Sequence, residues 1–193
     1  MGRAQSFDTD TVVRAALGVF WELGFEAASL PDLERATGLN RSSLYNSFGN
    51  KRGLFDAAVE DYLDRVVRPR LAPLTGRDVA PEAVVDYLRQ LRASLATPGS
   101  LPARFGCLLV SVAGAPLGQD DVVRGVISGY RTEMLAAMTR GVQAHAPDLS
   151  DEELRQQAET TAGLIIAALA MARVDRDAAL ASLDAALWHL GNH

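Results

Sequence analysis

Apolar side chains recur at every third or fourth position through most of the chain, which is the spacing of one buried helix face. The pattern is first seen at residues 8–23, where Leu17 and Phe20 lie on the same face. Asp8 can cap the start of this helix, and Gly24 can adopt the left-handed conformation that ends it. No alternating apolar and polar run is bounded by hairpin turn residues. The sequence therefore predicts an all-α protein.

Two short helices and one long helix are expected next. Ser29 begins a capping-box sequence, Ser-Leu-Pro-Asp, and the helix that it opens ends before Gly38. Asn40 can cap a second short helix, and Asn50 can cap a long helix that runs toward Pro69.

A larger helical region is expected in the rest of the chain. The segment from Pro69 to Pro81 is rich in Pro, Gly and Thr and is predicted to be a loop. Four or five longer helices follow, at residues 82–96, 103–114, 119–145, 151–173 and 176–190. Most phenylalanines lie in the first 55 residues, whereas the remainder is built from Ala and Leu. This division favours a small domain followed by a larger one.

The composition, with 48% hydrophobic and 22% charged residues, is that of a globular protein. A net charge of -5 argues against a surface that binds nucleic acid everywhere. Residues 36–55, however, contain Arg41, Lys51 and Arg52 and no carboxylate, so a local positive patch is expected. The uncharged runs are too short to cross a membrane and no signal peptide is recognisable, which favours a cytoplasmic protein. A single cysteine, Cys107, excludes an internal disulfide and a multi-cysteine zinc site, and no metal or cofactor is expected.

Residues 29–48 place two short helices in sequence, joined by a tight turn. This is the arrangement of a helix-turn-helix unit, in which the second helix lies in the DNA major groove. Leu44 and Phe48, four residues apart, can dock the second helix onto the protein. Lys51 and the free amides at the start of the next helix can meet one phosphate. The remaining face carries groups that can hydrogen-bond phosphates and base edges: Arg41, Ser42, Ser43, Tyr45, Asn46 and Ser47.

The segment from Gly38 to Phe55, GLNRSSLYNSFGNKRGLF, resembles the signature of the TetR family of bacterial transcriptional regulators. The resemblance covers about residues 7–62. It implies a three-helix DNA-binding domain at residues 1–50 and a helical ligand-binding and dimerisation domain at residues 51–193. The pair Ser42-Ser43 departs from many members, which have a glycine there, and this leaves the operator sequence open.

The implied function is that of a repressor that a small molecule releases from a pseudo-palindromic operator. Its partners would be double-stranded operator DNA, a second copy of the chain and an unidentified effector. By the resemblance, Tyr45 and Lys51 would contact phosphates, although Tyr45 taken alone is more typical of a packing residue. The other expected DNA-binding residues are Ser29, Asn40, Arg41, Ser42, Ser43 and Asn46.

Two apolar stripes near the C-terminus are compatible with an intramolecular core, and the resemblance favours a homodimer interface instead. Their members are Leu154, Ala158, Thr161, Ile165, Ala168, Ala172, Leu180, Leu183, Leu187 and Leu190. A ligand pocket is expected in the middle helices. Its candidate lining is Tyr62, Leu88, Leu91, Leu95, Phe105, Cys107, Leu109, Tyr130, Met134 and Met138.

Cys107 has two interpretations. A lone cysteine flanked by Leu is typical of a small buried hydrophobe. The Gly-Cys-Leu context also resembles a branch of the family that responds to electrophiles or oxidants, and the neighbouring Arg104 favours a reactive thiolate.

Two other classes of function compete with this interpretation. An enzyme is not expected, because His145, His189 and His193 lie late in the chain and no spacing suggests a triad or a metal site. A helical scaffold that binds only proteins is the alternative, but it leaves the acid-free segment at residues 36–55 unexplained.

Overall fold

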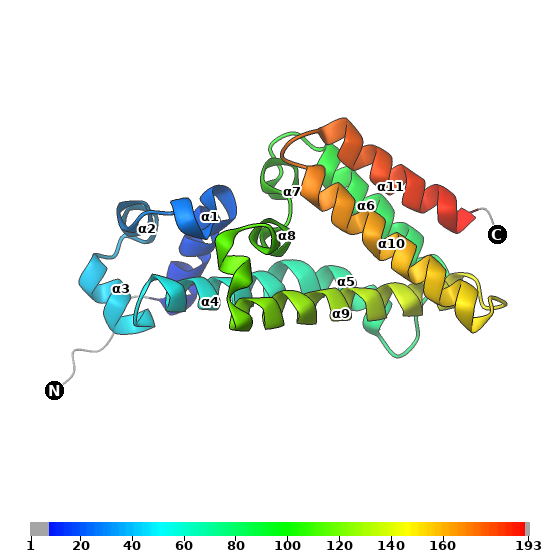
Figure 1. The fold of residues 1–193 in the computed structure, drawn as a ribbon, viewed down its shortest axis with the longest axis horizontal. Helices are drawn as coiled ribbons and strands as arrows, with labels where there is room; N and C mark the ends of the chain where they lie inside the picture. The colour runs from blue at the N-terminus through cyan, green and yellow to red at the C-terminus, as the bar shows by residue number, and fades with distance from the viewer. Residues whose placement is uncertain (1–7, 192–193) are drawn as a thin grey trace. The chain divides into compact units, whose positions relative to one another are not determined.

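The computed structural model describes residues 8–191, and every regular element within them is helical (Figure 1). The chain divides into two compact units, one ending at Val67 and the other beginning at Arg68. The first unit contains α1 (Thr9–Ala27), α2 (Leu30–Thr37), α3 (Arg41–Phe48), α4 (Lys51–Tyr62) and a π-helical turn, η1 (Leu63–Val67).

Helix α1 provides the centre of the first unit. Asp8 caps it by accepting a hydrogen bond from the Asp10 amide at 3.2 Å. Gly24 has the expected positive φ, 79°, and interrupts the helical backbone, but the assigned helix continues to Ala27. The Phe20 ring is fully buried and meets Phe55 of α4 edge to face, with 5.2 Å between ring centroids.

The boundary between the units differs from the one expected after residue 50. Helix α4 packs along α1, and Leu54, Phe55 and Ala58 are buried there. Tyr62, near the end of α4, meets Trp21 at 4.9 Å between ring centroids. The aromatic side chains of α1 therefore need α4 to complete their core, and this helix groups with the first unit.

The second unit begins with a helix where a loop was expected. Pro69 is the second residue of α5 and follows the π-helical turn η1, where the regular α-helical hydrogen-bond pattern is already interrupted. The predicted helix at residues 103–114 is in turn divided by Gly106, which has a φ of 64°. The helices of this unit are α5 (Arg68–Thr75), α6 (Ala83–Ala96), α7 (Leu101–Phe105), α8 (Leu108–Ala113), the 3-10 helix η2 (Pro116–Gln119), α9 (Asp121–His145), α10 (Asp151–Met171) and α11 (Arg176–Gly191).

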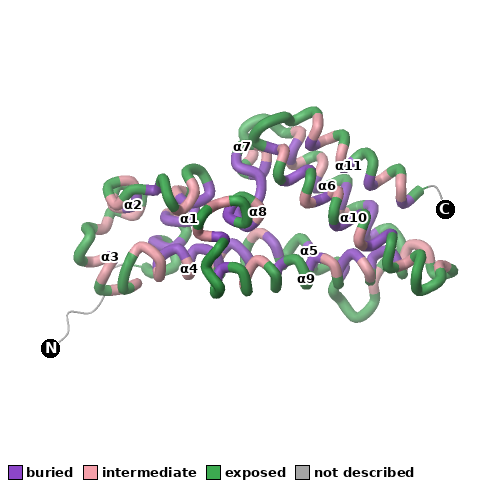
Figure 2. Tube along the Cα trace, viewed as in Figure 1, coloured by how far each residue is buried: buried purple, intermediate pink, exposed green. Residues whose placement is uncertain are grey.

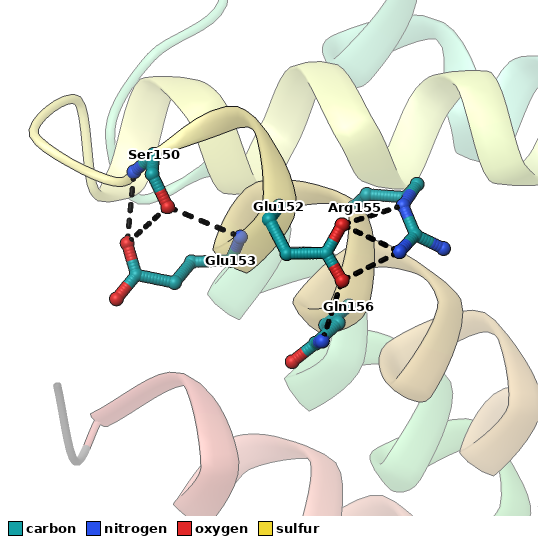
Figure 3. A network of polar contacts seen from close by, with 5 residues as sticks. All are labelled: Ser150, Glu152, Glu153, Arg155 and Gln156. Atoms are coloured by element: carbon teal, nitrogen blue, oxygen red, sulfur yellow. Dashed lines mark hydrogen bonds and ion pairs between the residues drawn. The ribbon is translucent and has the colours of Figure 1, made fainter.

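Helix α10 packs against both α9 and α11, and its buried residues alternate with exposed ones (Figure 2). Its start carries a capping box, in which the Ser150 amide donates to the Glu153 carboxylate at 2.9 Å (Figure 3). Glu152 pairs with Arg155 on the next turn. An ion pair of 2.8 Å between Arg131 and Glu159 joins α9 to α10.

One segment among the described residues, Leu101–Gln119, is apolar and long enough to cross a membrane by length and composition alone. The structure folds this segment as α7, α8 and η2 rather than as one straight helix. Gly106 cannot be replaced without a clash at the break, because an added Cβ would lie 2.5 Å from the Leu169 carbonyl oxygen.

Candidate nucleic-acid interface

Helix α2 starts with the expected capping box. The Ser29 amide donates to the Asp32 carboxylate at 3.1 Å, and the Asp32 amide donates to the Ser29 hydroxyl oxygen at 3.3 Å. The Ser29 hydroxyl also donates to the Asp32 carboxylate, and this hydrogen bond, followed by the one from the Ser29 amide, lowers the pKa of Asp32. Ser29 itself is exposed, so its side chain fixes the start of α2 at the surface of the unit.

The turn between α2 and α3 is held by two side chains. Gly38 ends α2 with a φ of 71°. Asn40 caps α3, its Oδ1 accepting from the Ser43 amide at 2.9 Å. Glu34 of α2 accepts a hydrogen bond from the Arg41 amide at 2.5 Å. The sequence pattern did not predict this role of Glu34. The signal for it was an acidic residue in the helix that precedes the acid-free α3.

Helix α3 has one buried side chain, Leu44, which is 1% exposed and docks the helix as predicted. Phe48, predicted to lie in the core with it, is only half-buried. The Arg41 guanidinium lies over the Tyr45 ring, 5.1 Å from its centroid. The rest of the predicted face also falls on the outer side, with Arg41, Ser42 and Asn46 exposed and Ser43 and Tyr45 half-buried.

Lys51 stands at the first position of α4. Its Nζ lies 4.6 Å from the centroid of the Phe25 ring. Burial lowers the pKa of Lys51, and the Glu26 carboxylate opposes this shift. The start of α4 approaches α3 closely, because a Cβ on Gly53 would clash with the Phe48 carbonyl oxygen. Gly53 therefore sets the contact that brings Lys51 next to α3, a role that the sequence pattern did not reveal.

The charges around α3 favour an anion. Arg52, the neighbour of Lys51, is engaged by Asp56 at 2.7 Å. The Glu34 carboxylate belongs to α2 and accepts from the Arg41 amide at the start of α3. No acidic side chain lies on α3 itself. The surface thus offers Arg41 and Lys51 as cations beside hydroxyl and amide groups, which are the groups that contact phosphates and base edges.

The structure buries most of the two C-terminal stripes inside one protomer. All members except Leu154, Leu180 and Leu187 are buried. Thr161, Ile165, Ala168 and Leu183 have no exposed surface at all. With these stripes α10 and α11 pack against other helices of the same unit, as in the interpretation of the stripes as an intramolecular core. The outer face of the two helices carries other apolar residues, such as Trp188, which is 69% exposed.

The expected pocket residues are buried, but not all in one unit. Tyr62 belongs to the first unit, whereas the other nine lie in the second. Leu91 lines a cavity of about 60 Å³ with Arg70, Tyr87, Gln90 and Ser94. Burial raises the pKa of Tyr87 to about 12, and Arg70 opposes this.

Cys107 is 1% exposed, and its Sγ lies 3.9 Å from the Tyr130 hydroxyl. Of the histidines, His145 has its Nδ1 2.9 Å from the Pro81 carbonyl oxygen, and His193 lies outside the described residues. Within residues 8–191, no group of three or more His, Cys, Asp or Glu side chains could hold a metal ion.

Comparisons with known proteins give the family of the chain. Residues 12–58 match the family model described as bacterial regulatory proteins, tetR family. The HTH-type transcriptional repressor ComR of Escherichia coli is 38% identical over 111 residues, 57% of this chain and 51% of ComR. The chain spans about half the length of the curated relatives it matches.

Solved structures extend the similarity to the whole chain. The TetR family transcriptional regulator CifR, solved as a cysteine mutant complexed with a 26-bp double-strand operator DNA, is 32% identical with a TM-score of 0.79. The match covers 96% of this chain and 98% of CifR. Reduced NemR of E. coli, at 20% identity and a TM-score of 0.76 over 95% of this chain and 94% of NemR, shares the fold. The chain therefore belongs to the TetR family of bacterial transcriptional regulators.

Proposed function

We propose that this regulator is a ligand-responsive repressor, which binds operator DNA as a homodimer and leaves it when a small molecule binds the second unit. The observation that carries the proposal is the exposed, acid-free face of α3, docked by the buried Leu44 and flanked by Lys51. The operator complex of CifR and the repressor name of ComR support it. Because operator DNA is the partner, we also propose the bacterial cytoplasm as the site of action.

In this proposal α3 enters the major groove. Arg41, Ser42, Ser43 and Asn46 hydrogen-bond base edges and the nearby backbone, while Tyr45 and Lys51 contact phosphates. The ring contact between Arg41 and Tyr45 holds the guanidinium at the exposed edge of the helix. Ser29 and Asn40 complete the interface at the starts of α2 and α3, where their side-chain oxygens already cap the helices.

Two copies are required because one recognition helix contacts only a few base pairs. We propose that the exposed faces of α10 and α11 form the dimer contact, with the half-buried Leu180 and Leu187 at its edge. Small residues let the facing helices approach closely, and Trp188 supplies a large apolar contact. The proposed contact residues are Gly163, Ala167, Ala170, Ala181, Ala185 and Trp188.

The effector site is proposed for the interior of the second unit, among the buried side chains of α6, α7, α8 and α9 and of Cys107 at the start of α8. A molecule that binds one arrangement of these helices more tightly than another shifts the dimer between states of different operator affinity. The buried candidates are Leu88, Leu91, Leu95, Phe105, Cys107, Leu109, Tyr130, Met134 and Met138.

A gel-shift assay on the DNA that flanks the protein's own gene tests this function. We expect the wild-type protein to retard this DNA and the Arg41→Ala/Asn46→Ala variant to lose the shift. Arg89→Ala is the matched control, since Arg89 is an exposed arginine of the second unit that pairs with Asp86. Equal retardation by the wild type and the α3 variant would contradict the proposal. Repeating the assay with added small molecules identifies those that release the DNA.

A further inference from the structure

Two polar side chains are buried in the middle of α10. Gln157 is 3% exposed and Thr161 is 0% exposed. They lie four residues apart, so both side chains fall on the same inward face of the helix. Buried polar groups at such positions are normally hydrogen-bonded.

Neither side chain has a partner among the residues that the structure describes. Both polar atoms of Gln157, Oε1 and Nε2, and the Thr161 hydroxyl oxygen are buried without a hydrogen bond. Two other helical threonines of this unit, Thr132 and Thr139, donate to the carbonyl oxygen four residues earlier. Burying three unpaired polar atoms opposes folding, and another molecule that bonded them would remove this cost.

The surroundings define which molecule fits. On α10 the neighbouring buried residues are Ala158, Ala162 and Ile165, all apolar. The charged side chains of the same turns, Arg155 and Glu159, are directed to the surface and paired with Glu152 and Arg131. No charged side chain of α10 shares this inward face, so an ionised ligand group beside Gln157 would find no counter-charge on this helix, which is unfavourable for a buried charge.

The hydrogen-bonding capacity narrows the ligand class further. A glutamine amide offers two donors and an acceptor, and a threonine hydroxyl offers one donor and an acceptor. An uncharged group that both donates and accepts, such as an amide or a lactam, matches this set. Met134 and Met138 of α9 are fully buried in the same unit, and methionine side chains adapt their shape to an apolar body.

We propose that Gln157 and Thr161 are the polar anchor of the effector site, and that the effector is an uncharged molecule with a donor and an acceptor on an apolar body. This inference rests on the proposed ligand response and adds the chemical class of the ligand. It also gives Thr161 a role different from the one expected in a dimer interface.

The first experiment measures the ligand-free protein. We expect Gln157→Met/Thr161→Val to raise the Tm by about 2–4 °C, because unpaired polar atoms are replaced by apolar atoms of similar size. Gln156→Met/Thr160→Val is the matched control, with the same residue types one position earlier on the exposed side of α10. An unchanged or lowered Tm in the buried variant would mean that the two groups already have a structural partner, such as a bound water, and would overturn the inference.

The second experiment measures binding by NMR titration of the protein without DNA. Benzamide is the probe, and benzoate and toluene are its charged and apolar counterparts. We expect benzamide to bind the wild type and the Gln156→Met/Thr160→Val control alike, and the buried variant at least tenfold more weakly. Benzoate should bind the wild type at least tenfold more weakly than benzamide, and toluene should not distinguish the proteins. Undetectable benzamide binding, equal binding to the buried variant, or equal binding of benzoate would overturn the inference.

Operator binding is measured separately on the same three proteins. A wild type that binds benzamide but no operator would contradict the proposed repressor while leaving this site intact. A wild type that binds operator but fails the benzamide test would contradict the proposed effector anchor and would leave the proposed DNA binding intact.

Discussion

The Arg41 amide donates a hydrogen bond to the Glu34 carboxylate across the turn between α2 and α3, with 2.5 Å between nitrogen and Oε1. A negative group at this position complements the positive end of the α3 dipole and satisfies a free amide of its first turn. The contact joins the two helices of the DNA-binding unit by a side chain on one and the backbone of the other.

Removing this contact should loosen the start of α3. We expect Glu34→Ala to raise the hydrogen-exchange rate of the Arg41 amide about fivefold, which corresponds to about 1 kcal/mol of local stability, the usual cost of losing a helix cap. Glu34→Gln keeps an acceptor and should recover part of the protection. If both variants exchange like the wild type, the contact does not hold the helix.

Lys51 and Arg52 are adjacent cations in different situations. Lys51 has its ammonium over Phe25, whereas Arg52 is paired with Asp56. We expect Lys51→Ala to weaken binding to all DNA sequences about equally. The slope of log affinity against log salt should fall by roughly 1 for each phosphate that a subunit no longer touches. Fluorescence anisotropy over a salt series measures it.

Arg52→Ala serves as the matched control for that slope. Because its guanidinium already has a counter-charge, its removal should leave the slope close to that of the wild type. Equal slopes for Lys51→Ala and the wild type would remove Lys51 from the phosphate contacts.

The DNA-binding unit was largely predictable because its signals are local. Ser29, Asn40 and Asn50 each accept the backbone hydrogen bond that a cap requires, as their residue types indicated. The docking role of Leu44 also followed from spacing. The roles of Glu34 and Gly53 were not predictable in this way, because each contacts the backbone of a different helix. Glu34 of α2 accepts from the Arg41 amide at the start of α3, and Gly53 of α4 lies against the Phe48 carbonyl oxygen at the end of α3.

The second unit was less predictable because burial there depends on which helices meet. The stripe containing Ile165 and Leu183 has the same spacing whether it faces another helix of the chain or a second copy. Only the packing of α10 on α9 and α11 distinguishes these two possibilities, and it buries Ile165 and Leu183 inside the protomer. Pro69 likewise favours a helix end by residue type, yet the π-helical turn before it already interrupts the regular hydrogen bonds, and α5 extends to Thr75.

The proposed dimer face makes a prediction about two substitutions of the same kind. Trp188→Glu should give a folded monomer, because Trp188 is 69% exposed in the protomer and a charge there disrupts the proposed contact between copies. Ile165→Glu should unfold the second unit, because this side chain is fully buried. Sedimentation equilibrium together with circular dichroism separates the outcomes. A monomeric wild type at micromolar concentration, or a dimeric Trp188→Glu protein, would exclude this face as the interface.

The burial of Cys107 favours the core interpretation of this residue over the sensor interpretation. With 1% of its surface exposed and its Sγ beside the Tyr130 hydroxyl, the thiol has almost no access for a reagent in the folded protein. We therefore expect maleimide to modify Cys107 at least a hundredfold more slowly in folded than in urea-unfolded protein. We also expect Cys107→Ala to bind operator DNA as the wild type does, and its response to a mild oxidant to equal that of the wild type. The opposite pattern, in which a mild oxidant releases operator DNA from the wild type but not from Cys107→Ala, would make the thiol the sensor.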